Sequence, residues 1–116
     1  MKKQFSFVLL ALLLSFSCAR KKQSTANQKQ EDNYVQNHYN KKEVKITMRD
    51  GVKLHATIYS PKDTSKKYPI LLQRTPYSCQ PYGEGKFRKR IGPNPLLMKE
   101  GNIIVYEDVR GRWMSE

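Results

Sequence analysis

Two short, continuously apolar segments constrain the fold of this chain more than any other feature. They are residues 70–72, within YPILLQR, and residues 103–106, within NIIVYEDV. An unbroken apolar run of this length is typical of a strand buried on both faces, as in a sheet covered by helices. Two such strands joined by a crossover predict parallel pairing in an α/β sheet.

The segment between these strands contains a long loop and a short helix. Residues 75–95 are rich in Pro and Gly, and a loop of this length within a compact domain is usually functional or mobile. The sequence PLLMKEG predicts a helix that begins at Pro95 and stops at Gly101.

A β-hairpin precedes the first apolar strand. Residues 44–48 and 52–58 alternate apolar and polar side chains, and Asp50-Gly51 lies between them. Asp-Gly at this place predicts a type I′ turn, because both residues tolerate positive φ. His55 falls on the polar face of the second strand, so we expect a surface residue rather than a ligand or a base.

These elements are an incomplete α/β domain. Four strands and one short helix cannot cover both faces of the two apolar strands, since such a sheet needs helices on each side. We therefore expect the chain to be the front part of a larger enzyme, truncated at Glu116.

The N-terminus has the pattern of a secretory signal. Lys2 and Lys3 precede an apolar run at 5–17, which is too short to span a bilayer as a mature helix. The run ends at Cys18, in a context that resembles the lipobox of bacterial lipoproteins. This resemblance implies secretion across the inner membrane and a lipid anchor on Cys18, at a bacterial membrane facing the periplasm or the exterior. The alternative is an ordinary signal cleaved near Ala19.

The domain organisation follows from composition. Residues 1–18 are the signal peptide with its lipobox-like end. Residues 19–42 are polar and almost without aliphatic side chains, which predicts a disordered tether. Residues 43–116 are the folded portion.

Part of the formal net charge of +12 belongs to the signal and its flank, and the densest cluster in the remainder is residues 86–90, KFRKR. A basic run with an aromatic residue can contact phosphates. A secretory signal argues against a nucleic-acid partner, however, and a solvated loop face is the simpler interpretation. A small basic, lipid-anchored binding protein without catalysis is the alternative to an enzyme.

The cysteines predict neither a disulfide nor a metal site. With Cys18 removed or lipidated, Cys79 has no partner, and no Cys or His pair has zinc-ligand spacing. Cys79 lies in the Pro-rich loop without a base nearby in sequence, so we interpret it as an ordinary loop cysteine. No cofactor is expected.

Three segments in this order carry a resemblance to a known family. They are MRDGVKLHATIYSP (48–61), YPILLQRTPY (68–77) and EGNIIVYEDVRGRWMSE (100–116). Together they resemble the N-terminal part of the catalytic domain of the CocE/NonD family, X-Pro dipeptidyl-peptidase-like serine hydrolases of the α/β-hydrolase superfamily. The resemblance implies metal-free hydrolysis of a small ester, amide or peptide substrate by a Ser-His-Asp triad.

The triad itself is not in these residues. No G-x-S-x-G elbow occurs, so the nucleophile and its His and Asp partners are expected beyond residue 116. By resemblance Tyr77, in Thr-Pro-Tyr, donates its hydroxyl to the oxyanion hole, and Tyr82 is a weaker candidate for lining the substrate pocket. The alternative for Tyr77 is an aromatic residue packed under its loop. Asp108 and Arg110 are expected to hold their loop together by pairing or by backbone hydrogen bonds.

Overall fold

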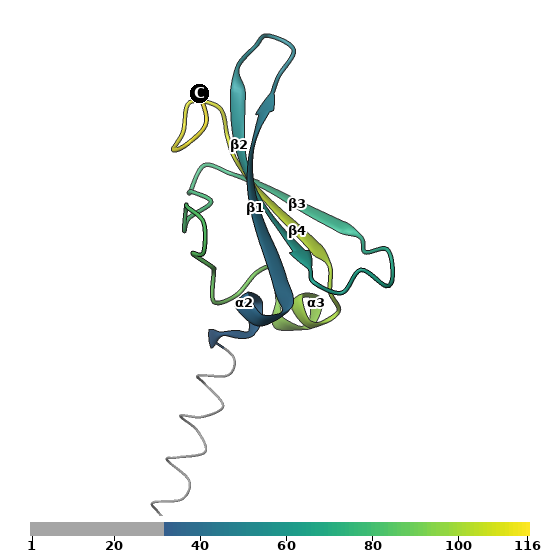
Figure 1. The fold of residues 1–116 in the computed structure, drawn as a ribbon. Helices are drawn as coiled ribbons and strands as arrows, with labels where there is room; N and C mark the ends of the chain where they lie inside the picture. The colour runs from purple at the N-terminus through teal and green to yellow at the C-terminus, as the bar shows by residue number, and fades with distance from the viewer. Residues whose placement is uncertain (1–31) are drawn as a thin grey trace, which may run out of the picture. The chain divides into compact units, whose positions relative to one another are not determined.

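A computed structural model describes residues 32–116, which form one four-stranded sheet and two short helices (Figure 1). The strand order in the sheet is β1-β2-β4-β3. Along the chain the elements are α2 (Tyr34–His38), β1 (Tyr39–Thr47), β2 (Lys53–Pro61), β3 (Ile70–Thr75), α3 (Pro95–Lys99) and β4 (Ile103–Asp108). The predicted signal peptide, Cys18 and residues 19–31 of the predicted tether lie outside the described residues.

The predicted parallel pairing is confirmed. β3 and β4 run parallel, with Ile70 opposite Ile103 and Thr75 opposite Asp108. The sequence did not predict that β4 would lie between β3 and the hairpin, where it pairs antiparallel to β2. The sheet is therefore mixed, and the carboxyl ends of β3 and β4 meet at one edge.

The two apolar strands differ in burial. In central β4, Ile104 and Tyr106 are buried. Along β3, Ile70 is 65% and Leu72 is 57% exposed, so the prediction of a strand buried on both faces is wrong for β3 in the described part of the chain. The reason is position: within residues 32–116, β3 is an edge strand that pairs only with β4.

The hairpin has a different turn from the predicted one. The backbone N–H of Met48 donates to Val52 O (2.8 Å), and that of Gly51 donates to Met48 O (3.0 Å). Gly51 has φ +87°, whereas Asp50 is not among the described residues with positive φ. A type I′ turn needs positive φ at both central residues, so this is a three-residue loop that ends on a left-handed glycine. The Asp50 carboxylate accepts a hydrogen bond from the backbone N–H of Val52 (3.3 Å), which stabilises the three-residue loop.

Residues 34–42 were expected to belong to the disordered tether, and the structure corrects this. Val35 on α2 and Tyr39 at the start of β1 are almost fully buried. The Tyr39 hydroxyl donates a 2.6 Å hydrogen bond to the carbonyl of Met98, in α3. The average composition of the segment conceals these two buried apolar residues, one at the end of the tether and one at the start of a strand.

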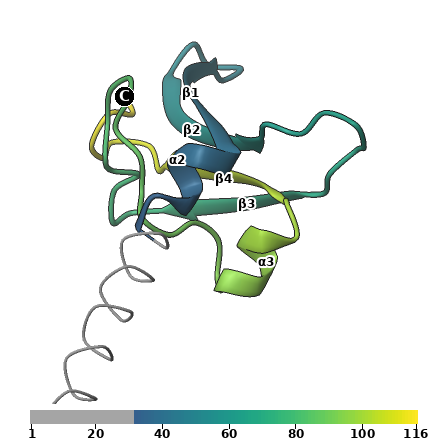
Figure 2. The same ribbon diagram turned by 60° about the horizontal axis from the view of Figure 1, so that its bottom comes forward.

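The core is built partly from the long loop between β3 and α3. Figures 1 and 2 show this loop as an extended segment that returns from the end of β3 to the start of α3. Two of its residues, Cys79 and Ile91, are buried with side chains from α2, α3 and the sheet. The loop is thus held against the sheet at two points. The buried cluster comprises Val35, Tyr39, Tyr59, Cys79, Ile91, Met98, Ile104 and Tyr106.

Candidate active site

The parallel strands β3 and β4 deliver two loops to the same edge of the sheet. The N–H of Val109 donates to Thr75 O (3.2 Å), so the pairing extends just past both strands. We name the following segments the Tyr77 loop (residues 76–82) and the C-terminal loop (residues 109–116). In α/β sheets, ligands bind beyond the carboxyl ends of the strands, which makes this edge the place to look for a site.

Asp108 joins these two loops. Its side chain is completely buried, and Oδ1 accepts the backbone N–H of Cys79 at 2.8 Å. Oδ2 accepts the Tyr82 hydroxyl at 2.7 Å and lies 3.5 Å from the Met114 nitrogen. The expectation that Asp108 holds its loop by hydrogen bonds is confirmed, and it also holds the Tyr77 loop.

Arg110 has a different role from Asp108. Its Nη1 lies 2.5 Å from Oδ2 of Asp50 in the hairpin turn, and both side chains are about half exposed. The pair links the C-terminal loop to the hairpin, and such exposed pairs add little stability.

Ser115, the only serine of the C-terminal loop, ties this loop to β2. Its hydroxyl donates a hydrogen bond to the backbone carbonyl of Asp108 (2.7 Å) and accepts one from the backbone N–H of His55 (2.8 Å).

Tyr82 is the last residue of the Tyr77 loop, and its side chain is fixed by hydrogen bonds. Besides its bond to Asp108, its hydroxyl lies 3.1 Å from Ser78 Oγ and accepts the Cys79 N–H at 3.3 Å. Burial, together with the hydrogen bond to Asp108, raises the pKa of Tyr82. The hydroxyl therefore supports the loop, and a contact of Tyr82 with substrate stays a prediction.

Tyr77 projects from this supported loop into solvent. Its side chain is 85% exposed, so within residues 32–116 the ring is not packed under its loop. Its backbone N–H donates to Thr75 Oγ1 (3.0 Å), and the preceding carbonyl, of Pro76, accepts Trp113 Nε1–H (2.9 Å). The backbone on the N-terminal side of Tyr77 is thus held from β3 and from the C-terminal loop.

The backbone on the other side of Tyr77 is bent sharply. Ser78 has φ +90°, a backbone conformation that residues other than glycine rarely adopt. Its carbonyl accepts Arg88 Nη2–H (3.1 Å), and its Oγ accepts the Gln80 N–H (3.1 Å). Such strain persists only where surrounding contacts enforce it, and it is common at functional sites. Sequence reasoning missed Ser78 because no residue type there signals a positive φ.

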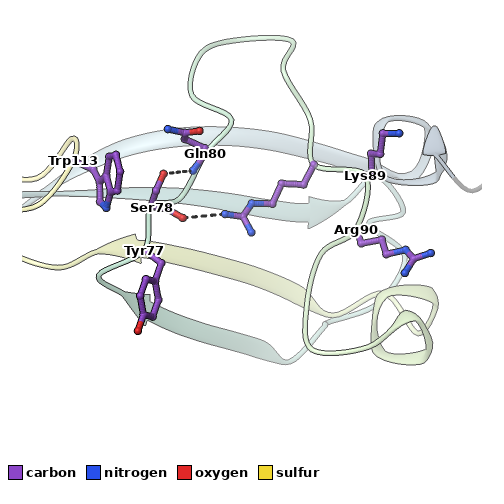
Figure 3. A pocket seen from close by; sticks show the side chains of 7 residues that line it. Tyr77, Ser78, Gln80, Lys89, Arg90 and Trp113 are labelled. Atoms are coloured by element: carbon purple, nitrogen blue, oxygen red, sulfur yellow. Dashed lines mark hydrogen bonds between the residues drawn. The ribbon is translucent and has the colours of Figure 1, made fainter.

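A depression of about 480 Å³ opens beside Tyr77. Figure 3 shows Tyr77 and Trp113 on one side of it and Lys89 and Arg90 on the other. The basic run at 86–90, interpreted from sequence as a solvated face, thus contributes cations to the surroundings of the predicted oxyanion donor. The residues that line the depression are Tyr77, Ser78, Gln80, Arg88, Lys89, Arg90 and Trp113.

Cys79 is not poised for chemistry. It is a free, fully buried thiol, and burial, followed by its contact with Asp108, raises the pKa to about 12. A nucleophilic cysteine needs a lowered pKa, because the thiolate is the reactive form. The interpretation of Cys79 as an ordinary loop cysteine agrees with this environment.

His55 was predicted to be a surface residue, and this is wrong: only 3% of it is exposed. Its Nε2 lies 3.3 Å from Thr57 Oγ1, and its ring meets the ring of Tyr82 edge-on at 5.2 Å between centroids. The alternation of β2 suggested one covered face, but the Tyr77 loop covers the other. Burial lowers the pKa of His55, although Glu43 and Asp108 oppose this shift.

The lowered pKa of His55 predicts a loss of stability in acid. An unfolded histidine takes up a proton near pH 6.5, whereas the folded one does so only at lower pH, so protons favour the unfolded state below about pH 6.5. We expect the thermal midpoint to fall between pH 7 and pH 5, and His55→Gln to make this fall smaller. The control is His38→Gln, at an exposed histidine. Equal pH slopes for wild type and His55→Gln, measured by calorimetry, would contradict the prediction.

Within residues 32–116, no helix is long and apolar enough to cross a membrane.

Comparison with known proteins identifies the family. A family model described as X-Pro dipeptidyl-peptidase (S15 family) matches residues 50–116. No curated protein matches the chain. Among solved structures, a selenomethionine-labelled α-amino acid ester hydrolase is 40% identical, with a TM-score of 0.57 over 68% of this chain and 14% of that chain. An aminopeptidase from a marine sediment archaeon, Thaumarchaeota archaeon, is 37% identical, with the same TM-score and coverage.

Both structural neighbours are hydrolases, and the chain spans about 14% of the length of each. The resemblance to CocE/NonD hydrolases drawn from the sequence is confirmed by these matches. The mixed sheet corresponds to an N-terminal portion of an α/β-hydrolase-like fold. This chain belongs to the X-Pro dipeptidyl-peptidase (S15) family.

Proposed function

We propose that the protein is a serine hydrolase that cleaves ester or amide bonds in small esters, amides or peptides. The observation that carries the proposal is the family match over residues 50–116 together with an exposed Tyr77 at the carboxyl end of a parallel strand pair. The two structural neighbours, named as an ester hydrolase and an aminopeptidase, support ester and peptide bonds as targets.

In the proposed reaction a serine attacks the substrate carbonyl, and negative charge develops on the carbonyl oxygen. Tyr77 donates its hydroxyl to that oxygen. A donor of this kind accelerates the reaction because its hydrogen bond strengthens in the transition state, provided that it is already in position. The hydrogen bonds to the Pro76 and Ser78 carbonyls hold the backbone from which Tyr77 projects.

The serine and its histidine and aspartate partners come, in this proposal, from sequence outside residues 1–116, which contain no G-x-S-x-G elbow. The exposed Ile70 and Leu72 on β3 support this arrangement. A solvent-exposed apolar edge strand is unfavourable in isolation, and pairing or covering by further elements removes the problem.

Labelling with a fluorophosphonate tests the proposal, because this reagent reacts with activated serines. We expect the protein expressed from its natural gene to be labelled on a serine in a G-x-S-x-G segment. The 116-residue chain should remain unlabelled and should not turn over 4-nitrophenyl acetate. An unlabelled natural protein would support the alternative, a small basic binding protein without catalysis. Saturable turnover by residues 1–116 alone would equally contradict the proposal.

We also propose that the protein is secreted and anchored through lipidated Cys18. The basic start, the apolar run at 5–17 and the lipobox-like end support this. Mass spectrometry of the mature protein should find an acylated cysteine as the first residue, and Cys18→Ser should release the protein from the membrane fraction. An unmodified N-terminus near Ala19 would show ordinary signal cleavage and would rule out the anchor.

A further inference from the structure

We infer that Arg88 is a positioning residue, which fixes the backbone bend at Ser78 and thereby the direction in which Tyr77 projects. Its effect on catalysis rests on the proposed function, in which Tyr77 donates to the oxyanion. Its effect on the conformation of the Tyr77 loop does not, because that effect follows from the contacts of Arg88 alone.

The bend at Ser78 determines where Tyr77 points. Ser78 has φ +90° and directly follows Tyr77 in the chain. A serine relaxes from this conformation to negative φ unless surrounding contacts hold it. On the far side of the bend, the backbone N–H of Cys79 is held by buried Asp108 at 2.8 Å. Relaxation at Ser78 would therefore move the backbone and side chain of Tyr77.

Arg88 contacts the bend directly. Its Nη2–H donates to the carbonyl oxygen of Ser78 (3.1 Å), and a dashed line at Ser78 in Figure 3 marks this hydrogen bond. The same view shows the Tyr77 hydroxyl directed away from the depression that Arg88 lines. Arg88 therefore acts on Tyr77 through the backbone and not by contact with its hydroxyl.

The sheet holds the guanidinium of Arg88 in place. Its central carbon lies 4.2 Å from the ring centroid of Tyr106, which is within cation–π distance. Tyr106 is buried on central β4, and its hydroxyl accepts the N–H of Gly92 (2.8 Å). Arg88 Nε is buried without a hydrogen-bond partner among the described residues, a position that a side chain free to move into solvent would leave. Arg88 thus connects the Tyr77 loop to a fixed ring of the sheet.

The two contacts together need the shape of an arginine side chain. A planar guanidinium can lie against an aromatic ring and donate a hydrogen bond from its edge at the same time. A lysine ammonium keeps the charge, but it is a compact and strongly hydrated group that cannot make the same pair of contacts. Arg88→Lys therefore separates the connection between loop and sheet from the presence of a positive charge near the site.

The first test is steady-state kinetics on a neutral ester with the protein expressed from its natural gene. Arg88→Met should lower kcat about 10–100-fold with little change in KM, because a displaced oxyanion donor weakens binding of the transition state. Arg88→Lys should lower kcat by a similar factor. The control Lys86→Met removes the same charge at an exposed position of the same loop, and its kcat should stay within about twofold of wild type. Wild-type kcat in Arg88→Lys would overturn the inference.

The second test repeats Arg88→Met in the Tyr77→Phe protein. If Arg88 acts by placing the Tyr77 hydroxyl, kcat of the double variant should stay within about twofold of that of Tyr77→Phe, since residues that act as a unit are not additive. A general structural role would instead lower kcat by the same factor in both backgrounds. That result would contradict the inference.

Hydrogen exchange keeps this inference separable from the proposed function. Mass spectrometry of the natural protein should show the amides of residues 76–82 exchanging about tenfold faster in Arg88→Met, the factor for one lost charge-assisted hydrogen bond. Lys86→Met should exchange at the wild-type rate. Unchanged exchange in Arg88→Met would overturn the inference even if esters were hydrolysed normally. Faster exchange in a protein that hydrolyses no ester would support the inference and contradict the proposed function.

Discussion

Replacing Tyr77 by phenylalanine is expected to lower kcat of the natural protein about 100–1000-fold, the usual effect of losing one oxyanion donor. KM should change little, because the lost hydrogen bond matters mainly in the transition state. The substitution removes a single oxygen from a side chain that is 85% exposed, so it should not disturb the fold. Steady-state kinetics on a neutral ester provides the measurement.

Tyr68→Phe is the matched control for this prediction. It removes a tyrosine hydroxyl whose partner is the exposed Asp63 (2.8 Å), outside the residues that line the depression. Its kcat should stay within about twofold of wild type, since surface changes away from a site are usually small. If Tyr77→Phe also stays within that range, Tyr77 is not an oxyanion donor.

The second large effect is expected for Asp108→Ala. The substitution removes the acceptor that the buried Cys79 N–H shares with the part-buried Tyr82 hydroxyl. Only weaker contacts at 3.1–3.3 Å remain for these two donors. A buried donor that loses its acceptor costs about 1–3 kcal/mol, so the free energy of unfolding should fall by about that amount. Because Asp108 joins the Tyr77 loop to the C-terminal loop, cleavage by proteases should also begin in residues 76–82.

Asp50→Ala is the control for Asp108→Ala. Asp50 also accepts a side-chain donor from the C-terminal loop, but its pair with Arg110 is half exposed and should contribute little. Chemical denaturation of both variants gives the comparison. An Asp108→Ala protein as stable as Asp50→Ala would show that the buried carboxylate does not hold the loops.

The sequence predicted the elements that depend on local patterns. Parallel pairing of the segments at 70–75 and 103–108 followed from two apolar runs and a crossover, and the short helix at 95–99 followed from its proline and glycine. The place of β4 between β2 and β3 could not be predicted, because pairing between distant segments leaves no local signal. The same holds for the exposure of β3, which depends on its position at the edge of the sheet.

The errors at His55 and at residues 34–42 have a common physical origin. Periodicity and composition describe a segment alone, whereas burial depends on what packs against it. His55 is covered by Tyr82 from a loop distant in sequence, and Tyr39 is covered by α3. His55 and Tyr39 are therefore buried by contacts with residues distant in sequence, which the pattern of their own segments could not predict.

The sequence predicted only some residues of the candidate site. Tyr77 came from a family resemblance, whereas Ser78 and Trp113 had no signal of their own. Arg88 belongs to the basic run at 86–90, but that run gave no indication of a place beside Tyr77. These residues are brought together by the loop between β3 and α3 and by the C-terminal loop, which Asp108 joins. Position in space, rather than spacing along the chain, places residues 88–90 at the same depression as Tyr77.

The most direct test of the account is a crystal structure of the natural protein after reaction with a phosphonate inhibitor. The phosphonyl oxygen then stands for the oxyanion of the transition state. The account predicts that the Tyr77 hydroxyl lies about 2.7–3.1 Å from that oxygen. A Tyr77 hydroxyl beyond about 3.5 Å, with other donors around the oxygen, would contradict the central claim.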